Sequence, residues 1–387
     1  MDISFHYFAV KTVAFAAGFS EAEAQRIAEF SQFIDDFNWY TLRAAKDIPS
    51  YITSNPALDI VYNKTLHLIN PVTTGFSDWF DMATLVTDRS QKFTVAPFHF
   101  IPKDKTNVDE GDFRTVPADL DDGSYISNML ARLRRDIAEE GAFTQDSLMR
   151  MGMLMHTFAD TYAHQLFSGY NEACNSVKLN SVFNNITQED ESEKYAFWVN
   201  EWILKIEKIL KTKLPAIGHM VIAHVPDLTH ISFEMEYQDR SGAKRVHARS
   251  NTSTFAVVCQ KLYRYMRMVL GEEVPARADW DDLAVRLSAG FLFDAAEVLE
   301  KGEKEAVPAL IRHWSGVFPE YSYSYDSEAI KKRFVQSASA AASEELIAAV
   351  DGCEANGLLY RFTDEFYKFN LFADQHLIAL YGNSPRQ

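Results

Sequence analysis

The sequence has few cysteines and lacks the long apolar run that a membrane-spanning helix requires. Its three cysteines, Cys174, Cys259 and Cys353, are odd in number and widely spaced among 387 residues, which argues against a disulfide framework and against a thiolate zinc site. No run of about 18 uninterrupted apolar residues occurs, and no basic region followed by a small-residue cleavage site opens the chain. We therefore expect no transmembrane segment, no signal peptide and a cytoplasmic location.

Positive charge is also scarce, since the formal net charge is −16. A broad nucleic-acid-binding surface needs clustered Lys and Arg to displace counterions, so this mode of binding is not expected. A small phosphorylated substrate remains compatible with the charge if metal ions supply the positive potential. The hydrophobic content of 47% allows a large buried core. The sequence gives no indication of an oligomeric state.

Strand patterns are rare, whereas apolar residues at helical spacing recur along the chain. Only residues 231–237 alternate, with 246–249 able to pair with them as a hairpin. We predict an all-α fold with at most one β-hairpin, formed by one large helical domain over residues 1–387, with a possible subdivision near 301–308. The predicted helices cover residues 20–37, 125–140, 145–167, 191–214, 252–270, 280–301, 327–350 and 358–381. Residues 63–120 are expected to form a long irregular region.

The strongest functional pattern is the segment His156-Thr-Phe-Ala-Asp160-Thr-Tyr-Ala-His164, which lies within a predicted helix. Spacing of four residues puts the two imidazoles and the carboxylate on one helix face. At about 1.5 Å per residue, the two histidines are roughly 12 Å apart along the axis, too far to share one ion, while Asp160 reaches toward either. Small residues on this face, Gly152 among them, predict a hollow for a metal and its water. A hydrogen-bonded polar network between packed helices is the alternative.

Other histidines and carboxylates could converge on this helix. His6 opens the first helix, and His99 stands in an apolar stretch between Pro97 and Pro102, where a polar ring needs a partner. Acidic residues near a helix C-terminus oppose the macrodipole, which favours a positive partner for Asp35 and Asp36. Asp35 flanks the apolar stripe of its helix and is the better ligand of the two.

The segment between Pro215 and Pro226 contains two histidines that helical geometry separates by about 140°. His219, in the first turn of this expected short helix, is the predicted ligand; His224 and Asp227 are outside candidates. The predicted metal ligands are His6, Asp35, Asp36, His99, His156, Asp160, His164 and His219. Zinc suits this mixture best, with two or more ions, and other divalent metals fit the same donors.

This arrangement resembles the zinc-dependent phospholipase C and fungal single-strand nuclease superfamily, which is all-α and hydrolyses phosphodiesters with three zinc ions. The resemblance implies that His156 and Asp160 form the central His-x-x-x-Asp pair and that His164 is the ligand one turn later. It further implies that Asp35 and His99 complete the first zinc site, with His6 and His219 as the early and late histidines. Phrases such as Pro-Phe-His-Phe-Ile-Pro and Ser-Gln-Phe-Ile-Asp-Asp also resemble an uncharacterised bacterial family of unknown function.

The sequence departs from the superfamily in three ways. It begins with Met-Asp, whereas the superfamily has a mature N-terminal Trp whose amine ligates zinc. Ala223 stands four residues after His219, where the superfamily has a Glu. The gap from Asp160 to His164 is shorter than the superfamily usually shows. The implied function is a metal-dependent phosphoesterase in which a metal-activated water attacks a phosphoester and Asp35 is the orienting or basic carboxylate. The His-Asp phosphohydrolases are disfavoured, because no His-Asp dipeptide occurs. The alternative is a non-catalytic helical scaffold with a polar or vestigial site.

Overall fold

The computed structural model describes residues 1–58, 60–75, 87–211, 213, 216–293, 303–340, 343–349 and 357–382. It is a mixed α/β structure, 54% helical and 14% strand, with one five-stranded and one four-stranded sheet. The prediction of an all-α fold with at most one hairpin is therefore wrong. Among the described residues, no helix combines the length and the apolar character needed to cross a bilayer.

Two compact units make up the chain. The first comprises Met1–Gln32 and Met82–Tyr325, and the second comprises Phe33–Asp81 and Asp326–Gln387. Both units are thus assembled from segments distant in the sequence. Residues 303–308, within the predicted subdivision, belong to the first unit as the start of helix α14.

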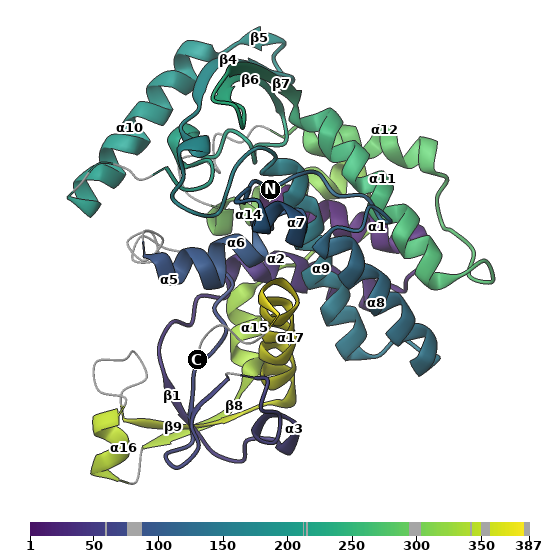
Figure 1. Cartoon of the computed structure of the whole chain (residues 1–387). Helices are drawn as coiled ribbons and strands as arrows, with labels where there is room; N and C mark the ends of the chain where they lie inside the picture. The colour runs from purple at the N-terminus through teal and green to yellow at the C-terminus, as the bar shows by residue number, and fades with distance from the viewer. Residues whose placement is uncertain are drawn as a thin grey trace. The chain divides into compact units, whose positions relative to one another are not determined.

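The first unit is mainly helical and contains one antiparallel sheet with the order β5-β4-β6-β7 (Figure 1). The sheet consists of β4 (Lys178–Asn184), β5 (Glu189–Asp190), β6 (Ile231–Gln238) and β7 (Lys244–Ser250). Its longer helices are α1 (Val10–Ala17), α2 (Glu21–Asp36, in this unit up to Gln32), α8 (Tyr125–Glu140), α9 (Gln145–Ala163), α10 (Ser192–Leu210), α11 (Asn251–Leu270), α12 (Trp280–Phe291) and α14 (Glu303–Val317). Short helical segments are η1 (Ser4–Ala9), α5 (Asp88–Ser90), η2 (Gln91–Val95), α6 (Ala96–Phe98), α7 (Lys105–Asp109), η3 (Ala173–Asn175) and η4 (Met220–Ile222).

Helix α9 lies at the centre of the first unit, where it packs against η1, α8 and α11. Its N-terminus is fixed by a capping box, in which the Thr144 hydroxyl accepts a hydrogen bond from the Ser147 amide and the Ser147 hydroxyl accepts one from the Thr144 amide. Nearly every residue from Ser147 to Ala163 is buried. The capping signal and the length of the segment make this helix predictable from the sequence.

The second unit contains a mixed sheet with the order β2-β3-β1-β9-β8. Its strands are β1 (Arg43–Ala45), β2 (Val61–Asn63), β3 (Leu68–Ile69), β8 (Val335–Ala340) and β9 (Leu358–Phe362), and its helices are α3 (Ser50–Thr53), α15 (Ser327–Phe334), α16 (Glu344–Ala349) and α17 (Asp364–Tyr381). Strand β1 pairs in parallel with β9, whereas the other pairs are antiparallel. Aromatic rings of α15 and α17 pack with those after Gln32 to form its core.

The helix predicted over 327–350 ends at Phe334, and the helix predicted over 358–381 begins only at Asp364. Strands β8 and β9 take the intervening residues, with Ala338 opposite Tyr360. Local composition misled the prediction, because the Ala-Ser run of β8 favours a helix. Its pairing partner, β9, lies too far along the chain to influence a local pattern. Residues 212, 214, 294–301, 341, 342 and 350 of the predicted helices lie outside the described residues.

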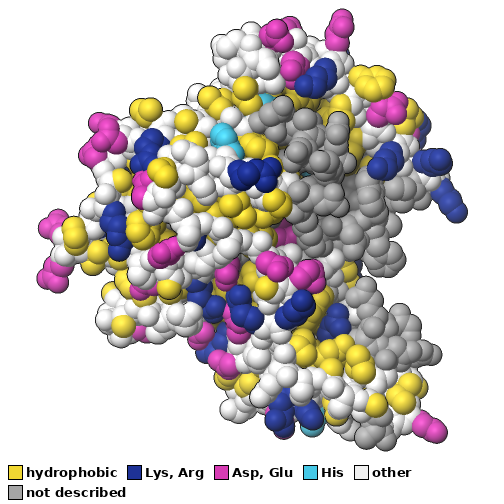
Figure 2. Space-filling view, turned by 180° about the vertical axis from the view of Figure 1, so that it is seen from behind, with side chains coloured by type: hydrophobic (Ala, Val, Ile, Leu, Met, Phe, Trp, Pro, Cys, Tyr) yellow, Lys and Arg dark blue, Asp and Glu magenta, His cyan; other side chains and the backbone are white. Residues whose placement is uncertain are grey.

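The charged side chains on one face of the molecule are of mixed sign. Figure 2 shows Lys and Arg side chains distributed among Asp and Glu over this face, without one sign occupying a large area among the described residues.

Candidate metal centre

Helix α9 contributes three polar side chains to one buried site. His156, Asp160 and His164 are 0%, 1% and 4% exposed. The Nε2 atom of His156 lies 3.2 Å from Oδ2 of Asp160, and Nδ1 of His164 lies 3.6 Å from the same oxygen. The four-residue spacing therefore places Asp160 between the two imidazoles, on one face of the helix.

Two histidines from other segments join Asp160 and His156 to form what we term the first cluster. His6, from the π-helical segment η1, has its Nε2 atom 3.1 Å from Oδ1 of Asp160. His99, which follows η2 and α6, has its Nδ1 atom 3.4 Å from Oδ2 of Asp160 and 3.2 Å from Nε2 of His156. His6 thus lies in a π-helical segment, and His99 follows another. Such segments are rare in proteins overall, and those that occur are often found at functional sites.

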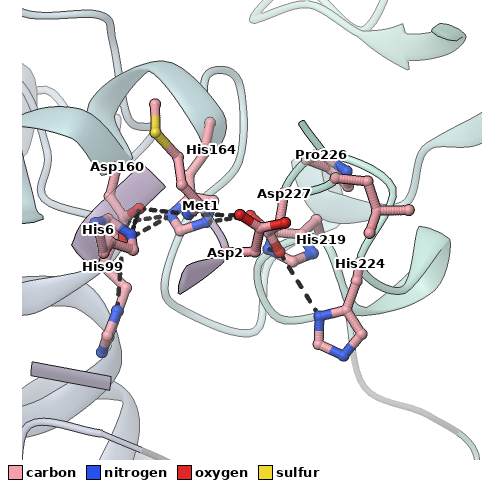
Figure 3. Close-up of polar contacts among 12 residues, drawn as sticks. Met1, Asp2, His6, His99, Asp160, His164, His219, His224, Pro226 and Asp227 are labelled. Carbon is pink, nitrogen blue, oxygen red and sulfur yellow. Dashed lines mark hydrogen bonds and ion pairs between the residues drawn. The ribbon is translucent and has the colours of Figure 1, made fainter. Parts of the chain in front are cut away.

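The second cluster consists of His164, His219 and Asp227. Nε2 of His164 is 3.2 Å from Oδ1 of Asp227, and Nε2 of His219 is 3.2 Å from Oδ2 (Figure 3). One ligand atom of each residue lies within 4.8 Å of the others, a spacing that could hold a metal ion. His224 stands at the edge, with Nδ1 3.7 Å from Oδ2 of Asp227 and a side chain that is 58% exposed.

Backbone carbonyls fix which ring nitrogens carry hydrogen in the second cluster. His219 Nδ1 lies 2.6 Å from the Ala223 carbonyl oxygen, and His164 Nδ1 lies 2.5 Å from that of His99. A carbonyl only accepts hydrogen bonds, so both Nδ1 atoms donate. In a neutral ring the Nε2 atom then carries a lone pair, and both Nε2 lone pairs face the carboxylate of Asp227. This is the orientation in which metal-ligating histidines are usually held.

The electrostatics favour the neutral form of His6, His156 and His219 and the ionised form of Asp160. Burial, reinforced by the nearby Met1 amino group, lowers the pKa of His6 to about 4, and burial lowers the pKa of His219 to about 4. Burial alone would raise the pKa of Asp160, but the charges of His164 and the Met1 amino group hold it well below its ordinary value. Neutral imidazoles and ionised carboxylates are the forms that bind metal ions.

The backbone nitrogen of Met1 lies between the two clusters. It is 2.7 Å from Oδ1 of Asp160 and 3.2 Å from Oδ1 of Asp227, and its side chain is fully buried. The neighbouring Asp2 is 4% exposed, accepts a hydrogen bond from the Ser4 amide, and has its pKa raised by burial to about 7. The two clusters are therefore linked through Asp160, His164 and Met1 into one continuous polar centre.

Arg249, at the end of β7, holds the backbone behind the second cluster. It donates to the carbonyls of Tyr162 and Ala163, at the end of α9, and to that of Pro226. The guanidinium is buried and stacks on Phe233. Because these carbonyls directly precede His164 and Asp227, Arg249 sets the separation of two members of the cluster.

We expect Arg249→Lys to weaken zinc binding at the second cluster by about 10- to 100-fold, the usual effect of changing a residue that orients metal ligands. A lysine keeps the charge but lacks the planar fork that reaches three carbonyls. Competition with a chromogenic chelator measures the affinity. Arg245→Lys, on the same strand but with a side chain that is 60% exposed, is the matched control and should bind zinc as the wild type does. Equal affinities for both variants would contradict this role.

The structure brings together most of the residues that the sequence singled out. His6, His99, His156, Asp160, His164 and His219 all contribute to the two clusters. Asp35 and Asp36 occupy the last turn of α2 and belong to the second unit. Their roles as ligands, and the role of Asp35 as base, stay predictions of the sequence.

The hollow expected beside Gly152 is not there. A Cβ atom at this position would lie 2.2 Å from the carbonyl oxygen of Ile27, so the glycine allows α9 to pack closely against the backbone of α2. The short helix expected after Pro215 is also wrong among the described residues, which form only the turn η4 from Met220 to Ile222. This turn lets His219 and Asp227, eight residues apart, face each other.

Sequence reasoning gave too little weight to Asp227 and missed Asp2. Asp227 follows Pro226, which lacks a backbone N–H and so disfavours a continuing helix, and the absence of an acid four residues after His219 was the available signal. Asp2 does not lie at a regular sequence spacing from any other candidate ligand. Only the burial of the first residues beside α9 reveals it.

Comparison with known proteins places the chain in a family. No curated protein and no solved structure matches the sequence. The comparisons therefore do not support the resemblance to the phospholipase C and single-strand nuclease superfamily. Residues 1–382 match a family of unknown function, DUF6765, which bears out the resemblance to an uncharacterised family. The chain belongs to this family of unknown function.

Proposed function

We propose that the protein is a metal-dependent hydrolase, with zinc as the best-suited metal and a phosphoester as substrate. One observation carries the proposal: Nε2 of neutral His219 faces a charged carboxylate oxygen of Asp227 at 3.2 Å, with its hydrogen on the far nitrogen. A lone pair facing a carboxylate oxygen at this distance is repulsive. A cation between the two atoms removes the repulsion.

The donor set favours zinc. Four buried histidines and two buried aspartates offer imidazole nitrogens and carboxylate oxygens, the ligands that zinc takes alongside thiolates. Neither described free cysteine belongs to the clusters, and none of the candidate metal-binding groups among the described residues consists of oxygen ligands alone, as calcium and magnesium prefer. Two clusters fit two ions, with Asp160 adjacent to both.

Zinc bound at such a site supplies an activated water near neutral pH and neutralises charge that develops on phosphoryl oxygens. The chain's contribution is to orient the ligands. His99 and Ala223 carbonyls fix the tautomers, Arg249 fixes the separation, and Asp160 shares its two oxygens between neighbouring imidazoles. The negative charge of the protein makes such local positive charge necessary for binding a phosphoester.

A non-catalytic protein is the second candidate. In this alternative the Met1 amino group serves as the permanent cation, paired with Asp160 and Asp227, and the imidazoles complete a hydrogen-bonded network. The two candidates differ in how the stability of the protein responds to chelators. A structural network keeps its stability when metal is removed, whereas a metal centre loses it.

Elemental analysis after zinc loading tests the proposal. We expect two or more equivalents in the wild type, with His219→Ala and His156→Ala each losing about one, because each variant removes a ligand from a different cluster. His313→Ala is the matched control, since His313 lies in the same unit, belongs to neither cluster, and has its Nε2 3.0 Å from the Gly290 carbonyl oxygen. Hydrolysis of bis-(p-nitrophenyl) phosphate by the loaded protein then tests the reaction. A wild type that binds no zinc, and whose stability chelators do not change, would leave the non-catalytic protein.

A further inference from the structure

Exposure differs between members of the polar centre. The side chains of His6, His156 and Asp160 are 0–1% exposed, those of His99, Asp227 and His219 are 10%, 11% and 14% exposed, and that of His224 is 58% exposed. His6, His156 and Asp160 are therefore enclosed by protein, whereas His219 and Asp227 are partly accessible and have the well-exposed His224 beside them.

Two tryptophans of α10 stand beside His224. The ring centroid of Trp198 is 6.4 Å from that of His224, with an interplanar angle of 38°, and Trp202 is at 6.1 Å with an angle of 76°. Residues four apart project from the same helix face, so the two indoles form one surface. Both are partly exposed. Tyr195, on the same face of α10, has its ring centroid 6.1 Å from that of Trp198, and its hydroxyl lies 3.3 Å from Nε2 of His230.

The geometry points to a substrate that carries a flat aromatic or heteroaromatic ring close to its phosphoryl group, held by Trp198 and Trp202 at the side of His224; this inference rests on the proposed function. Relative to the His224 ring, the indole of Trp198 is tilted and that of Trp202 is edge-to-face, so two partly exposed aromatic rings border this side of the second cluster and are available to pack against a flat guest. The second cluster binds the phosphoryl group, and the tryptophans select the organic group attached to it.

The remainder of α10 provides a matched comparison. Phe197 is 68% exposed and next to Trp198, so it points to another side of the helix and has no aromatic contact with His224 among those described. General hydrophobic attraction would draw a ligand to Phe197 as readily as to the tryptophans. If Trp198 and Trp202 select the ligand, substitutions at these two positions should change its affinity and a substitution at Phe197 should not.

Calorimetric titration of the zinc-loaded protein with phosphonates tests the inference, because their carbon–phosphorus bond is not hydrolysed. Methylphosphonate, cyclohexylphosphonate and phenylphosphonate share the metal-binding group and differ in the organic one. We expect phenylphosphonate to bind roughly 10-fold or more tightly than both others, in the range that aromatic stacking gives. Trp198→Leu and Trp202→Leu keep apolar bulk but remove the flat face, and should each lose most of this preference. Phe197→Leu should retain it.

The possible results distinguish the role of the two tryptophans from the proposed metal centre. Equal binding of phenylphosphonate and cyclohexylphosphonate, or a preference that survives both tryptophan variants, would overturn the role of Trp198 and Trp202 while leaving the metal centre in place. Failure of all three phosphonates to bind the zinc-loaded wild type would overturn the phosphoester substrate and this inference together. Unchanged methylphosphonate affinity in the tryptophan variants shows that the metal-binding group is still recognised and that the variants are folded.

Discussion

Asp160→Asn should release zinc from the first cluster and lower the free energy of unfolding of the metal-free protein by about 3–5 kcal/mol. Asp160 lies within 3.6 Å of four imidazole nitrogens and 2.7 Å from the Met1 nitrogen. An amide has the same shape but no charge. The variant therefore leaves the buried amino group with Asp227 alone and removes the carboxylate common to the ligands.

Elemental analysis measures the metal, and urea titration followed by circular dichroism measures stability in chelator. Asp121→Asn is the matched control, because Asp121 is exposed and the same loss of charge there should change neither quantity measurably. Because the chain has two units, the transition is followed with a second probe, tryptophan fluorescence, before a two-state analysis is applied. Full zinc content in Asp160→Asn would contradict the assignment of Asp160 as a shared ligand.

Gly152→Ala should destabilise the protein by about 3 kcal/mol, at the upper end of the usual cost of overpacking. The added methyl group would lie 2.2 Å from the Ile27 carbonyl oxygen and 3.0 Å from the Ser31 nitrogen, both of which are backbone atoms of α2. Neither can rotate away as a side chain would. Helix α9 has to shift, and since it carries His156, Asp160 and His164, zinc affinity should fall as well.

Gly316→Ala is the control for this prediction. Gly316 lies inside α14, and a Cβ atom there would meet no heavy atom within 4 Å. The same substitution should therefore stabilise the protein by about 0.5–1 kcal/mol, because alanine restricts the unfolded chain and favours a helix. Urea midpoints for the two variants should move in opposite directions. A midpoint for Gly152→Ala equal to that of the wild type would show that the helices do not pack as closely as described.

The sequence predicted the elements whose signals are local. Thr144 and Ser147 form the capping box of α9, and four-residue spacing places Asp160 beside His156 and His164. The helix from Tyr125 to Glu140 also has the predicted bounds. Such elements depend on residues within a few turns of one another, so a single sequence contains the information that fixes them.

The errors arise where distant segments decide the structure. Strand β9 pairs in parallel with β1, more than 300 residues away, and β4 pairs with β6 across the whole of α10. Neither partner is visible from the local pattern. In the site, Asp227 faces His219 because a turn replaces the expected helix. The convergence of Met1 and Asp2 on α9 likewise depends on tertiary packing alone.

The shared carboxylate of Asp160 makes the two clusters energetically dependent on each other. Its Oδ1 atom faces His6 and the Met1 nitrogen, whereas its Oδ2 atom faces His99, His156 and His164. A cation at the first cluster neutralises much of this charge and so reduces the attraction for a cation at the second. By thermodynamic reciprocity, occupation of the second cluster weakens the first by the same factor. We therefore expect metal loading to be anticooperative, with one ion held tightly and the next exchanging more readily with its surroundings.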